Sequence, residues 1–417
     1  MNKTYLCIDL KSFYASVECV ERGLDPFKIN LVVADPDRGQ GAITLAATPA
    51  IKAFGVKSRG RIFEIPKNIE YIIAPPRMRL YMRYSALIYK IFLKYIASED
   101  IHVYSIDEAF LDITPYMHLY NLSPKQLAKR ILDDVYKTTG ITATVGIGSN
   151  LFLAKVALDV LAKHEKDNMG YLDEDLFRQL IWHHQPLSDI WMIGQGTSNH
   201  LARLGIYDLY ALAHYPPKVL YQEFGINAEI LIDHAWGKEP VEIKHIKAYK
   251  PKTNSLCNSQ ILFYDYDFQK AYIVLKEMVD TNVLNLCQKH LVCKHISLSI
   301  RYSKDIRKAT SASRKIEKAS NSFQYLMQEF TRLYNEIVDK RYPIRQIAIA
   351  FGKLQDEAYV EYDLFTDIEA LEKEKKLSCA INSIHNKYGK NALLKGMNLL
   401  DGATQRYRNQ TVGGHKG

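Results

Sequence analysis

The stretch IHVYSIDEAFLDIT, residues 101–114, decides the fold of this chain. Its two ends, IHVYS and FLDIT, are rich in β-branched and aromatic residues and predict two short strands. Between them lies the tight segment Ile-Asp-Glu-Ala, which carries the adjacent acids Asp107 and Glu108. We therefore expect a β-hairpin with two carboxylates at its tip.

The segments around this hairpin extend it into a sheet with helices. Residues 4–10 read as a buried strand that ends near Asp9, and a helix-capable stretch follows. Downstream, apolar residues at helical spacing from Ser123 to about Lys137 precede a strand, ITATVGIG, and a second helix, LFLAKVALDVLAK. The order β-α-β-β-α-β, with an insert in the first crossover, predicts a ferredoxin-like sheet with helices on one face.

Composition and charge limit the class of protein. With 417 residues, of which 47% are hydrophobic and 24% charged, the chain has the composition of a folded protein. Its length suits roughly two to four domains. The net charge is +9, and residues 251–350 hold 16 Lys and Arg against 9 Asp and Glu. This excess favours a polyanionic partner, although an ordinary basic surface would give the same numbers.

Neither a secretory leader nor a membrane span is expected. The first apolar run is broken at Asp9, and no later run approaches the ~18 apolar residues needed to cross a bilayer. The six cysteines show no C-x-x-C spacing, so neither a zinc site nor a disulfide framework is indicated. We expect a soluble protein of the reducing cytoplasm.

Three acids should meet at one edge of the predicted sheet, because Asp9 ends the first strand while Asp107 and Glu108 top the neighbouring hairpin. Carboxylates at close range repel one another unless cations neutralise them, and ligation by oxygen alone selects Mg²⁺ or Mn²⁺. Two such ions ~3.5–4 Å apart would support nucleotidyl transfer by in-line displacement. The alternative is that Asp107 and Glu108 are exposed turn residues and that Asp9 caps a strand.

Other residues have the chemistry to bind phosphate. Lys52 in the insert and Lys155 in the helix after VGIGSN could contact a triphosphate near the acids, or be ordinary surface lysines. A turn with Gly194 and Gly196 resembles a helix-hairpin-helix motif, whose backbone N–H groups approach a DNA phosphate; a simple helix cap is the alternative. Six basic residues are candidates for contacts with the DNA backbone: Arg301, Lys304, Arg307, Lys308, Arg314 and Lys315.

Taken together, these residues resemble the Y-family translesion DNA polymerases, in particular their UmuC-like branch, the ImpB/MucB/SamB family. The likeness spans nearly the whole chain. CIDL at 7–10 with FYASVE at 13–18 is similar to the first motif of the family, and YSIDEAFLD at 104–112 is similar to its second. Further segments match in the same order: VGIGSN at 145–150, LAK at 153–155, IGQGT at 193–197 and NSQ at 258–260.

The resemblance implies a metal site. Asp9, Asp107 and Glu108 would hold two Mg²⁺ ions, which Mn²⁺ could replace, with help from the Leu10 carbonyl.

It also implies a nucleotide site. Tyr14, next to Phe13, would form an aromatic wall beneath the incoming sugar, and Lys52 and Lys155 would contact the triphosphate.

An α+β architecture of the right-hand polymerase kind is implied as well. Its parts would be a ferredoxin-like palm, small fingers, a helical thumb with the helix-hairpin-helix, and an α/β little finger that binds DNA. The expected boundaries are residues 1–24 and 79–170 for the palm, 25–78 for the fingers, 171–240 for the thumb, 241–250 for a linker, 251–356 for the little finger and 357–417 for a C-terminal tail.

The resemblance further implies error-prone, template-directed synthesis across damaged DNA, in DNA repair and the SOS response. The partners would be primer-template DNA, dNTPs and a sliding clamp, with possible accessory subunits and a monomeric catalytic chain. The segment EYDLF at 361–365 resembles a clamp-docking peptide that places Leu364 and Phe365 in an apolar pocket. The alternative is that this pair anchors the tail to its own domain.

Two other functions fit parts of the pattern. A nucleotidyl cyclase can share a palm-like sheet and a two-metal carboxylate site, but it needs no DNA. A non-catalytic DNA-binding scaffold would keep the fold after losing the acids, whereas Asp9, Asp107 and Glu108 are all present here.

Overall fold

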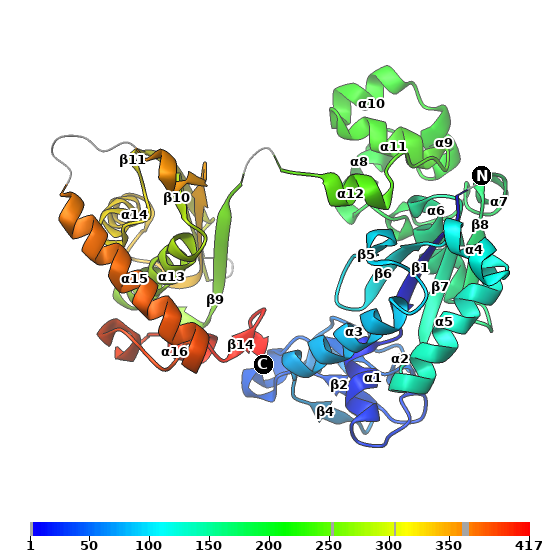
Figure 1. Ribbon diagram of the computed structural model, residues 1–417, viewed down its shortest axis with the longest axis horizontal. Coiled ribbons are helices and arrows are strands. Elements are labelled where there is room, and N and C mark those ends of the chain that lie inside the picture. Colours follow the sequence, from blue (N-terminus) through cyan, green and yellow to red (C-terminus); the bar gives the residue numbers. More distant parts are fainter. Residues whose placement is uncertain (1–2, 252–253, 304–305, 361–366) are drawn as a thin grey trace. The chain divides into compact units, whose positions relative to one another are not determined.

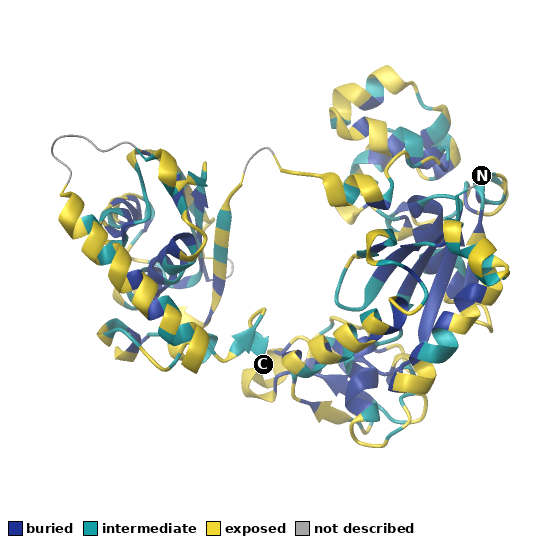
Figure 2. Ribbon diagram, in the orientation of Figure 1, coloured by how far each residue is buried: buried dark blue, intermediate teal, exposed yellow. Residues whose placement is uncertain are grey.

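The computed structural model describes residues 3–251, 254–303, 306–360 and 367–417. The chain divides into two compact units, one of Met1–Tyr249 with His415–Gly417 and the other of Lys250–Gly414. Figure 1 labels the elements of each unit, and Figure 2 shows which of them are buried. Within the described ranges, no helix combines the length and the apolar character needed to cross a membrane.

The first unit is built on a five-stranded sheet with the strand order β5-β6-β1-β7-β8. The strands are β1 (Tyr5–Leu10), β5 (Ile101–Val103), β6 (Glu108–Asp112), β7 (Ala143–Gly148) and β8 (Met169–Leu172). β1 is antiparallel to both of its neighbours, and β8 runs parallel to β7 at the edge. The expected ferredoxin-like sheet is thus confirmed, with β8 as an additional strand.

Helices lie on both faces of this sheet, so the prediction of helices on one face is wrong. α3 (Met78–Phe92) packs with α5 (Pro124–Thr139), and its side chains lie beside Ile8 of β1. α6 (Leu151–Val156) packs on the opposite face, where it contacts Cys7. Because successive strand residues point to opposite faces, Asp9 shares the α6 face with Cys7.

Glycines allow α6 to approach the sheet closely. A Cβ atom at Gly146 of β7 would lie 2.0 Å from the Ala154 carbonyl oxygen, and one at Gly148 would lie 2.2 Å from the Ala154 amide nitrogen. α6 begins after Asn150, whose side chain accepts a hydrogen bond from the Leu153 amide (2.8 Å), and continues into a π-helical turn, Ala157–Ala162. The side chains of this helix are therefore held against the end of the sheet that carries the acids.

The insert forms a small sheet of its own, with the order β3-β2-β4. Its elements are β2 (Leu31–Val33), β3 (Ala46–Ala47), α2 (Pro49–Lys52) and β4 (Ile72–Ala74), and it follows α1 (Phe13–Val20). Val32, Ala47 and Ile51 are fully buried in a core that belongs to the insert alone.

Short helices follow β8 and complete the first unit. They are α7 (Glu174–Leu180), α8 (Gln195–Arg203), α9 (Leu209–His214), α10 (Pro217–Phe224) and α11 (Asn227–Ala235), while α4 (Thr114–Tyr120) lies earlier in the chain. The stretch expected as a linker contains a further helix, α12 (Ile243–Ala248). Its Ile243 is buried in the same cluster as Cys7, so this segment packs on the sheet.

The second unit is an antiparallel sheet with the order β11-β10-β12-β9 and two helices on one face. Its elements are β9 (Leu256–Tyr266), α13 (Phe268–Gln288), β10 (Leu291–Tyr302), β11 (Thr310–Ser320), α14 (Phe323–Ile337) and β12 (Ile344–Gly352), with a short β13 (Gln355–Asp356) beside β10. Figure 2 shows the buried residues between this sheet and α13 and α14.

Residues 367–414 belong to the second unit. They form α15 (Ile368–Tyr388), α16 (Gln405–Arg408) and the short strand β14 (Thr411–Val412), whereas β15 (His415–Lys416) belongs to the first unit. The buried carboxylate of Glu277 on α13 accepts hydrogen bonds from the Asn398 side chain and the Thr404 amide, both at 2.8 Å. The C-terminal region expected as a tail is therefore folded against this sheet's helices.

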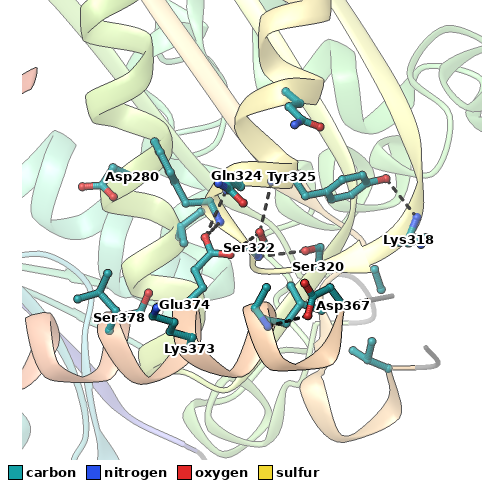
Figure 3. Close-up of a pocket in the computed structure, with 18 of the residues that line it drawn as sticks. Asp280, Lys318, Ser320, Ser322, Gln324, Tyr325, Asp367, Lys373, Glu374 and Ser378 are labelled. Carbon is teal, nitrogen blue, oxygen red and sulfur yellow. Dashed lines mark hydrogen bonds between the residues drawn. The ribbon is translucent and has the colours of Figure 1, made fainter. Parts of the chain in front are cut away.

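α15 also closes the start of α14. Figure 3 shows Glu374 of α15 reaching Ser322, which precedes α14. A hollow of about 660 Å³ lies beside these residues. The Glu374 carboxylate accepts hydrogen bonds from the Ser322 hydroxyl and the Phe323 amide, both at 2.6 Å. Leu364 and Phe365, the expected clamp-docking pair, lie outside the described residues.

Candidate active site

Strand pairing brings the three predicted acids to one end of the first sheet. Asp9 of β1 lies directly opposite Glu108 of β6 in the antiparallel register, and the Leu10 amide donates a hydrogen bond to the Asp107 carbonyl oxygen (3.0 Å). Asp9 and Asp107 are 98 positions apart in sequence, and the strand pairing that was expected to bring the hairpin to Asp9 is confirmed. Glu108 begins β6 and only Asp107 remains in the turn.

Asp107 and Glu108 act electrostatically on Asp9. Burial raises the pKa of Asp9 to about 7, and the negative charges of Asp107 and Glu108 add to this rise. A carboxyl group with two acidic neighbours in a buried place is the environment that a bound cation would relieve. The site therefore has the charge and the oxygen donors that suit a hard divalent ion.

In the structure, however, the Asp107 carboxylate accepts a hydrogen bond and the Glu108 carboxylate forms an ion pair. The Asp107 Oδ1 accepts a hydrogen bond from the Ser105 hydroxyl (2.6 Å), and Glu108 Oε1 lies 2.6 Å from the Lys155 ammonium. Across the described ranges, no three His, Cys, Asp or Glu side chains are gathered as a metal-binding group. The donor set thus suits the ion, but its side chains are not arranged as a closed cage.

Lys155 is the internal counter-charge of this acidic end. Its ammonium lies between Glu108 Oε1 (2.6 Å) and Asp159 Oδ2 (2.9 Å), and the side chain is almost fully buried. Burial would lower the pKa of Lys155, but the nearby groups of Cys7, Asp159 and Glu108 raise it above the ordinary lysine value. Lys155 is therefore charged, and it is turned toward the acids.

Lys163 is a cation of this site that the sequence reasoning missed. It lies just after the π-helical turn, and its ammonium is 2.9 Å from Asp159, which also binds Lys155. Lys163 and Lys155 both lower the pKa of Asp9, against the larger effect of burial. About half of the Lys163 side chain is exposed, so its ammonium, unlike that of Lys155, is accessible from solvent. The signal was the spacing Lys155-Asp159-Lys163, with charges at every fourth position of one helical stretch.

Lys52 comes from the insert to the turn that follows β1. Its ammonium donates a hydrogen bond to the Ser12 hydroxyl (2.8 Å), and burial lowers its pKa while the nearby Asp9 opposes that change. Ser12 has a left-handed backbone (φ 49°) and immediately precedes α1. The insert thus adds a third lysine beside the acids.

Phe13 and Tyr14 differ in their surroundings. Phe13 is 2% exposed and belongs to the core, so its side chain has almost no surface for a nucleotide. Tyr14 is partly exposed and stacks on Tyr81 of α3, with ring centroids 4.4 Å apart and an angle of 16° between the planes. The expected contact of Phe13 with a nucleotide is therefore not supported by its burial, whereas Tyr14 remains accessible.

The two glycines of the IGQGT segment lie at the start of α8. Gly194 precedes the first residue of the helix, and an added Cβ at Gly194 or Gly196 would have no atom within 4 Å. The backbone here is open, as the helix-hairpin-helix interpretation requires.

The predicted DNA contacts in the second unit fall into three groups. Arg301, Lys308 and Lys315 are exposed. Arg307 and Arg314 are bound by acids instead: Arg307 forms an ion pair with Asp339, and Arg314 lies 2.7 Å from Glu336 of α14. Lys304 lies outside the described residues.

The sequence reasoning also missed a face of the second sheet that is made of small side chains. Two ladders cross all four strands: Ser311, Ser299, Ala348 and Ser259 in one, and Ser313, Ser297, Ala350 and Cys257 in the other. These residues line a shallow depression on the face without helices. The signal was the alternation of small and apolar residues in ISLSI, TSAS and IAIAF.

Comparisons with known proteins match two segments of the chain to one family. Residues 8–159 match the model of the impB/mucB/samB family, and residues 253–364 match the C-terminal domain of the same family. The first match contains Asp9, Asp107 and Glu108, and the second contains the sheet with the small-residue face.

The chain is similar over its whole length to curated bacterial proteins. The UvrX protein of Bacillus subtilis (strain 168), named for UV-damage repair, is 32% identical, with 99% of this chain and 98% of the relative covered. DNA polymerase IV 2 of the same organism is 29% identical over the same shares, and DNA polymerase IV of Clostridium acetobutylicum is 25% identical over 96% and 99%.

The fold also matches a solved structure, a Y-family DNA polymerase chimera of Dbh and Dpo4, with a TM-score of 0.65 and 23% identity. The match covers 85% of this chain and 99% of the chimera. The chain therefore belongs to the impB/mucB/samB family and is a Y-family, DNA-directed DNA polymerase.

Proposed function

We propose that this polymerase performs error-prone, template-directed synthesis across damaged DNA, by nucleotidyl transfer that depends on two divalent ions. The observation that carries the proposal is the cross-strand pair of Asp9 and Glu108 with Asp107 beside it. The names of the relatives add support, since one is named for UV-damage repair and others are DNA polymerases IV. The family membership also removes the nucleotidyl cyclase alternative.

Asp9, Asp107 and Glu108, with the Leu10 carbonyl, would hold the two ions, Mg²⁺ by preference and Mn²⁺ as a substitute. When bound, the ions would activate the primer 3′-hydroxyl and stabilise the leaving pyrophosphate. Glu108 would bind an ion and also forms an ion pair with Lys155. Lys155 would therefore hold the Glu108 carboxylate in place and balance its charge.

Lys163 and Lys52 would bind the triphosphate of the incoming dNTP. Lys163 lowers the pKa of Asp9, and Asp9 acts to raise the pKa of Lys52, so both lysines lie close to Asp9. Lys163 belongs to the helical stretch after β7, and Lys52 belongs to the insert. Lys155 is the weaker candidate for this contact, because two carboxylates already bind its ammonium.

Tyr14 would form the surface beneath the sugar. Its ring is partly exposed next to the acids, and Asp107 contributes, after burial, to a raised pKa of its hydroxyl. A flat ring in this place would exclude a 2′-hydroxyl by contact alone, so the pocket would select deoxyribonucleotides.

Primer-template DNA would contact two surfaces. The open backbone at Gly194 and Gly196 would approach a phosphate without interference from side chains. In the second unit, the small-residue ladders would let the DNA backbone lie close to the sheet, with Lys315 and Arg301 supplying charge beside them.

A sliding clamp, accessory subunits and a cytoplasmic location remain part of the proposal. The docking of a clamp would rest on Leu364 and Phe365, and an exchange of both for alanine would remove stimulation by the clamp while clamp-free extension continues.

Primer extension by the purified full-length chain tests the central proposal. With Mg²⁺ and all four dNTPs we expect extension of an undamaged primer-template and insertion opposite an abasic site, and with EDTA we expect neither. Mn²⁺ should restore extension after EDTA is removed. Activity that is unaffected by EDTA would overturn the two-ion mechanism, and extension that always stops before the abasic site would overturn the translesion role.

A further inference from the structure

A buried polar chain lies beneath the Tyr14 ring. Tyr14 stacks on Tyr81, which is fully buried, and the Tyr81 hydroxyl donates a hydrogen bond to Glu18 Oε1 (2.8 Å). Glu18 lies one turn after Tyr14 along α1 and has no exposed side-chain surface. The Tyr14 ring therefore stacks on Tyr81, whose hydroxyl is fixed by its hydrogen bond to Glu18.

The Glu18 carboxylate is fully occupied by donors. Arg77 binds it with two hydrogen bonds, from Nε to Oε1 (2.9 Å) and from Nη2 to Oε2 (2.8 Å), and Arg22 binds Oε2 as well. Burial alone would raise the pKa of Glu18, but the hydrogen bonds from Arg77, Arg22 and Tyr81 hold it below the usual glutamate value. Bidentate pairing fixes the plane of a carboxylate as well as its charge. The Glu18 carboxylate, which accepts the hydrogen bond from the Tyr81 hydroxyl, is therefore held in one orientation.

These residues lie where the insert joins the rest of the first unit. Glu18 is in the last turn of α1, just before the chain enters the insert, and Arg77 is the residue that precedes α3, where the chain returns. The ion pair therefore ties together the two chain segments on which the insert is carried. It ties them at the level of Tyr81, which follows Arg77 by one turn of α3.

We propose that Arg77, Glu18 and Tyr81 are positioning residues for sugar selectivity, which hold the Tyr14 ring in the orientation that excludes a ribonucleotide. The inference rests on the proposed role of Tyr14. None of the three touches the reacting atoms; each acts through the next, from the ion pair to the stacked ring. A shift of the Arg77 guanidinium would release the Glu18 carboxylate, free the Tyr81 hydroxyl and let the Tyr14 ring rotate.

The alternative is a polar network that only stabilises the core. Such a network would affect folding and overall activity but would treat deoxyribonucleotides and ribonucleotides alike. The deciding quantity is therefore the ratio of kcat/KM for a dNTP to kcat/KM for the matching ribonucleotide, measured by primer extension with the full-length chain.

Two variants disrupt the contacts between Arg77 and Tyr14 at different residues. Tyr81→Leu removes the stacked ring, and Glu18→Gln keeps the size of the side chain but loses the bidentate ion pair. We expect each to lower the selectivity ratio about tenfold, which corresponds to a coupling of roughly 1.4 kcal/mol. Tyr81→Phe keeps the stack and loses only the hydroxyl, so its ratio should fall less than that of Tyr81→Leu.

A matched control is available one turn further along α3. Tyr84 donates a hydrogen bond from its hydroxyl to Glu21 Oε1 (2.7 Å), as Tyr81 does to Glu18, but no stacking joins it to Tyr14 among the described residues. Tyr84→Phe therefore removes the same kind of bond and should leave the selectivity ratio unchanged. A fall in that variant equal to the fall in Tyr81→Phe would overturn the proposal.

The background of Tyr14→Ala separates the inference from the function on which it rests. If Tyr14 selects the sugar, Tyr14→Ala lowers the ratio, and adding Tyr81→Leu or Glu18→Gln lowers it no further. Additive losses in the double variants would show that the network acts elsewhere and would sink the inference. An unchanged ratio in Tyr14→Ala itself would refute the role of Tyr14, and a parent chain without extension would refute the proposed function.

Discussion

The two sheets of this molecule have the same chain order, β-α-β-β-α-β, but different strand orders. In the first unit the first strand, β1, lies inside the sheet between β6 and β7, whereas in the second unit the first strand, β9, lies at the edge beside β12. An inner first strand places Asp9 beside the hairpin that carries Asp107 and Glu108. The position of one strand thus decides which sheet can assemble an acidic site.

The surfaces of the two sheets differ accordingly. The first sheet is covered by helices on both faces, and acids and lysines meet where its strands end. The second sheet has helices on one face and small neutral side chains on the other. The first sheet gathers charged side chains where its strands end, and the second presents a face of small neutral side chains.

The largest expected effect comes from the acidic end. Asp107→Ala removes one carboxylate from the developing charge of the reaction, and we expect the rate of primer extension to fall by at least ~10²–10³. DNA affinity, measured by fluorescence anisotropy, should be retained, because the proposed DNA-binding surfaces do not include Asp107. Asp133→Ala, which removes a half-exposed acid of α5 that forms an ion pair with Lys129, is the control. Loss of DNA binding together with activity in Asp107→Ala would contradict this division of roles.

The second prediction tests the small-residue face. Ser299→Glu places a negative charge in the centre of that face, where a phosphate backbone would lie, and should weaken duplex binding about tenfold through repulsion and lost close approach. The side chain is on the face without helices, so the fold should persist. Gln324→Glu on α14 adds the same charge to the helical side and should leave the affinity unchanged. Equal losses in both variants would mean that only net charge matters.

The third prediction uses two neighbours on β11 that point to opposite faces. Lys315 is exposed beside the small-residue ladders, while the Arg314 guanidinium binds Glu336 on α14. Lys315→Ala should weaken DNA binding severalfold and lower the slope of log affinity against log salt by about 1. Arg314→Ala should change that slope little and affect stability instead. A larger change of slope in Arg314→Ala than in Lys315→Ala would reverse the assignment of the two faces.

Much of the first unit could be predicted from local sequence. The hairpin, the first strand and the strand ITATVGIG have strong strand patterns, and their order fixes the register that joins Asp9 to Glu108. What could not be predicted was the partner of each side chain. Lys155 was expected at a phosphate, but its ammonium is turned inward by Glu108 and Asp159, a contact that depends on α6 packing against Gly146 and Gly148.

In the second unit, the density of basic residues in the sequence did not show which of them form ion pairs within the fold. Six basic residues were singled out by their density in sequence, yet Arg307 and Arg314 are neutralised by acids that come from elsewhere in the fold. The small-residue ladders carry no charge and became visible only when the strands were paired. Strand alternation was in the sequence, but which face the helices cover was not.

The smallest expected effect concerns the segment that the second unit has gained at its C-terminal side. Glu374 of α15 adds to the N-terminal cap of α14, where the Ser322 side chain already accepts a hydrogen bond from the Tyr325 amide. The Glu374 carboxylate accepts hydrogen bonds from the Ser322 hydroxyl and from the first amide of the helix, that of Phe323. A negative group at a helix N-terminus also interacts favourably with the helix dipole. Glu374→Ala removes both contributions and should cost about 1–2 kcal/mol, within the range of lost N-terminal caps.

Because the chain has two units, a single melting temperature does not report on one of them. Hydrogen exchange of the α14 amides is the better measurement, and we expect faster exchange there in Glu374→Ala with no change in the strands of the first sheet. Glu372→Ala, which removes an exposed acid of α15 that lies 3.8 Å from Lys376, is the matched control. If the α14 amides exchange at the same rate in both variants, the Glu374 carboxylate does not stabilise α14, and α15 is held by its other contacts. If only Glu374→Ala responds, the Glu374 carboxylate stabilises the start of α14, in addition to the hydrogen bond that Asn382 of α15 donates to the Leu284 carbonyl oxygen (3.0 Å).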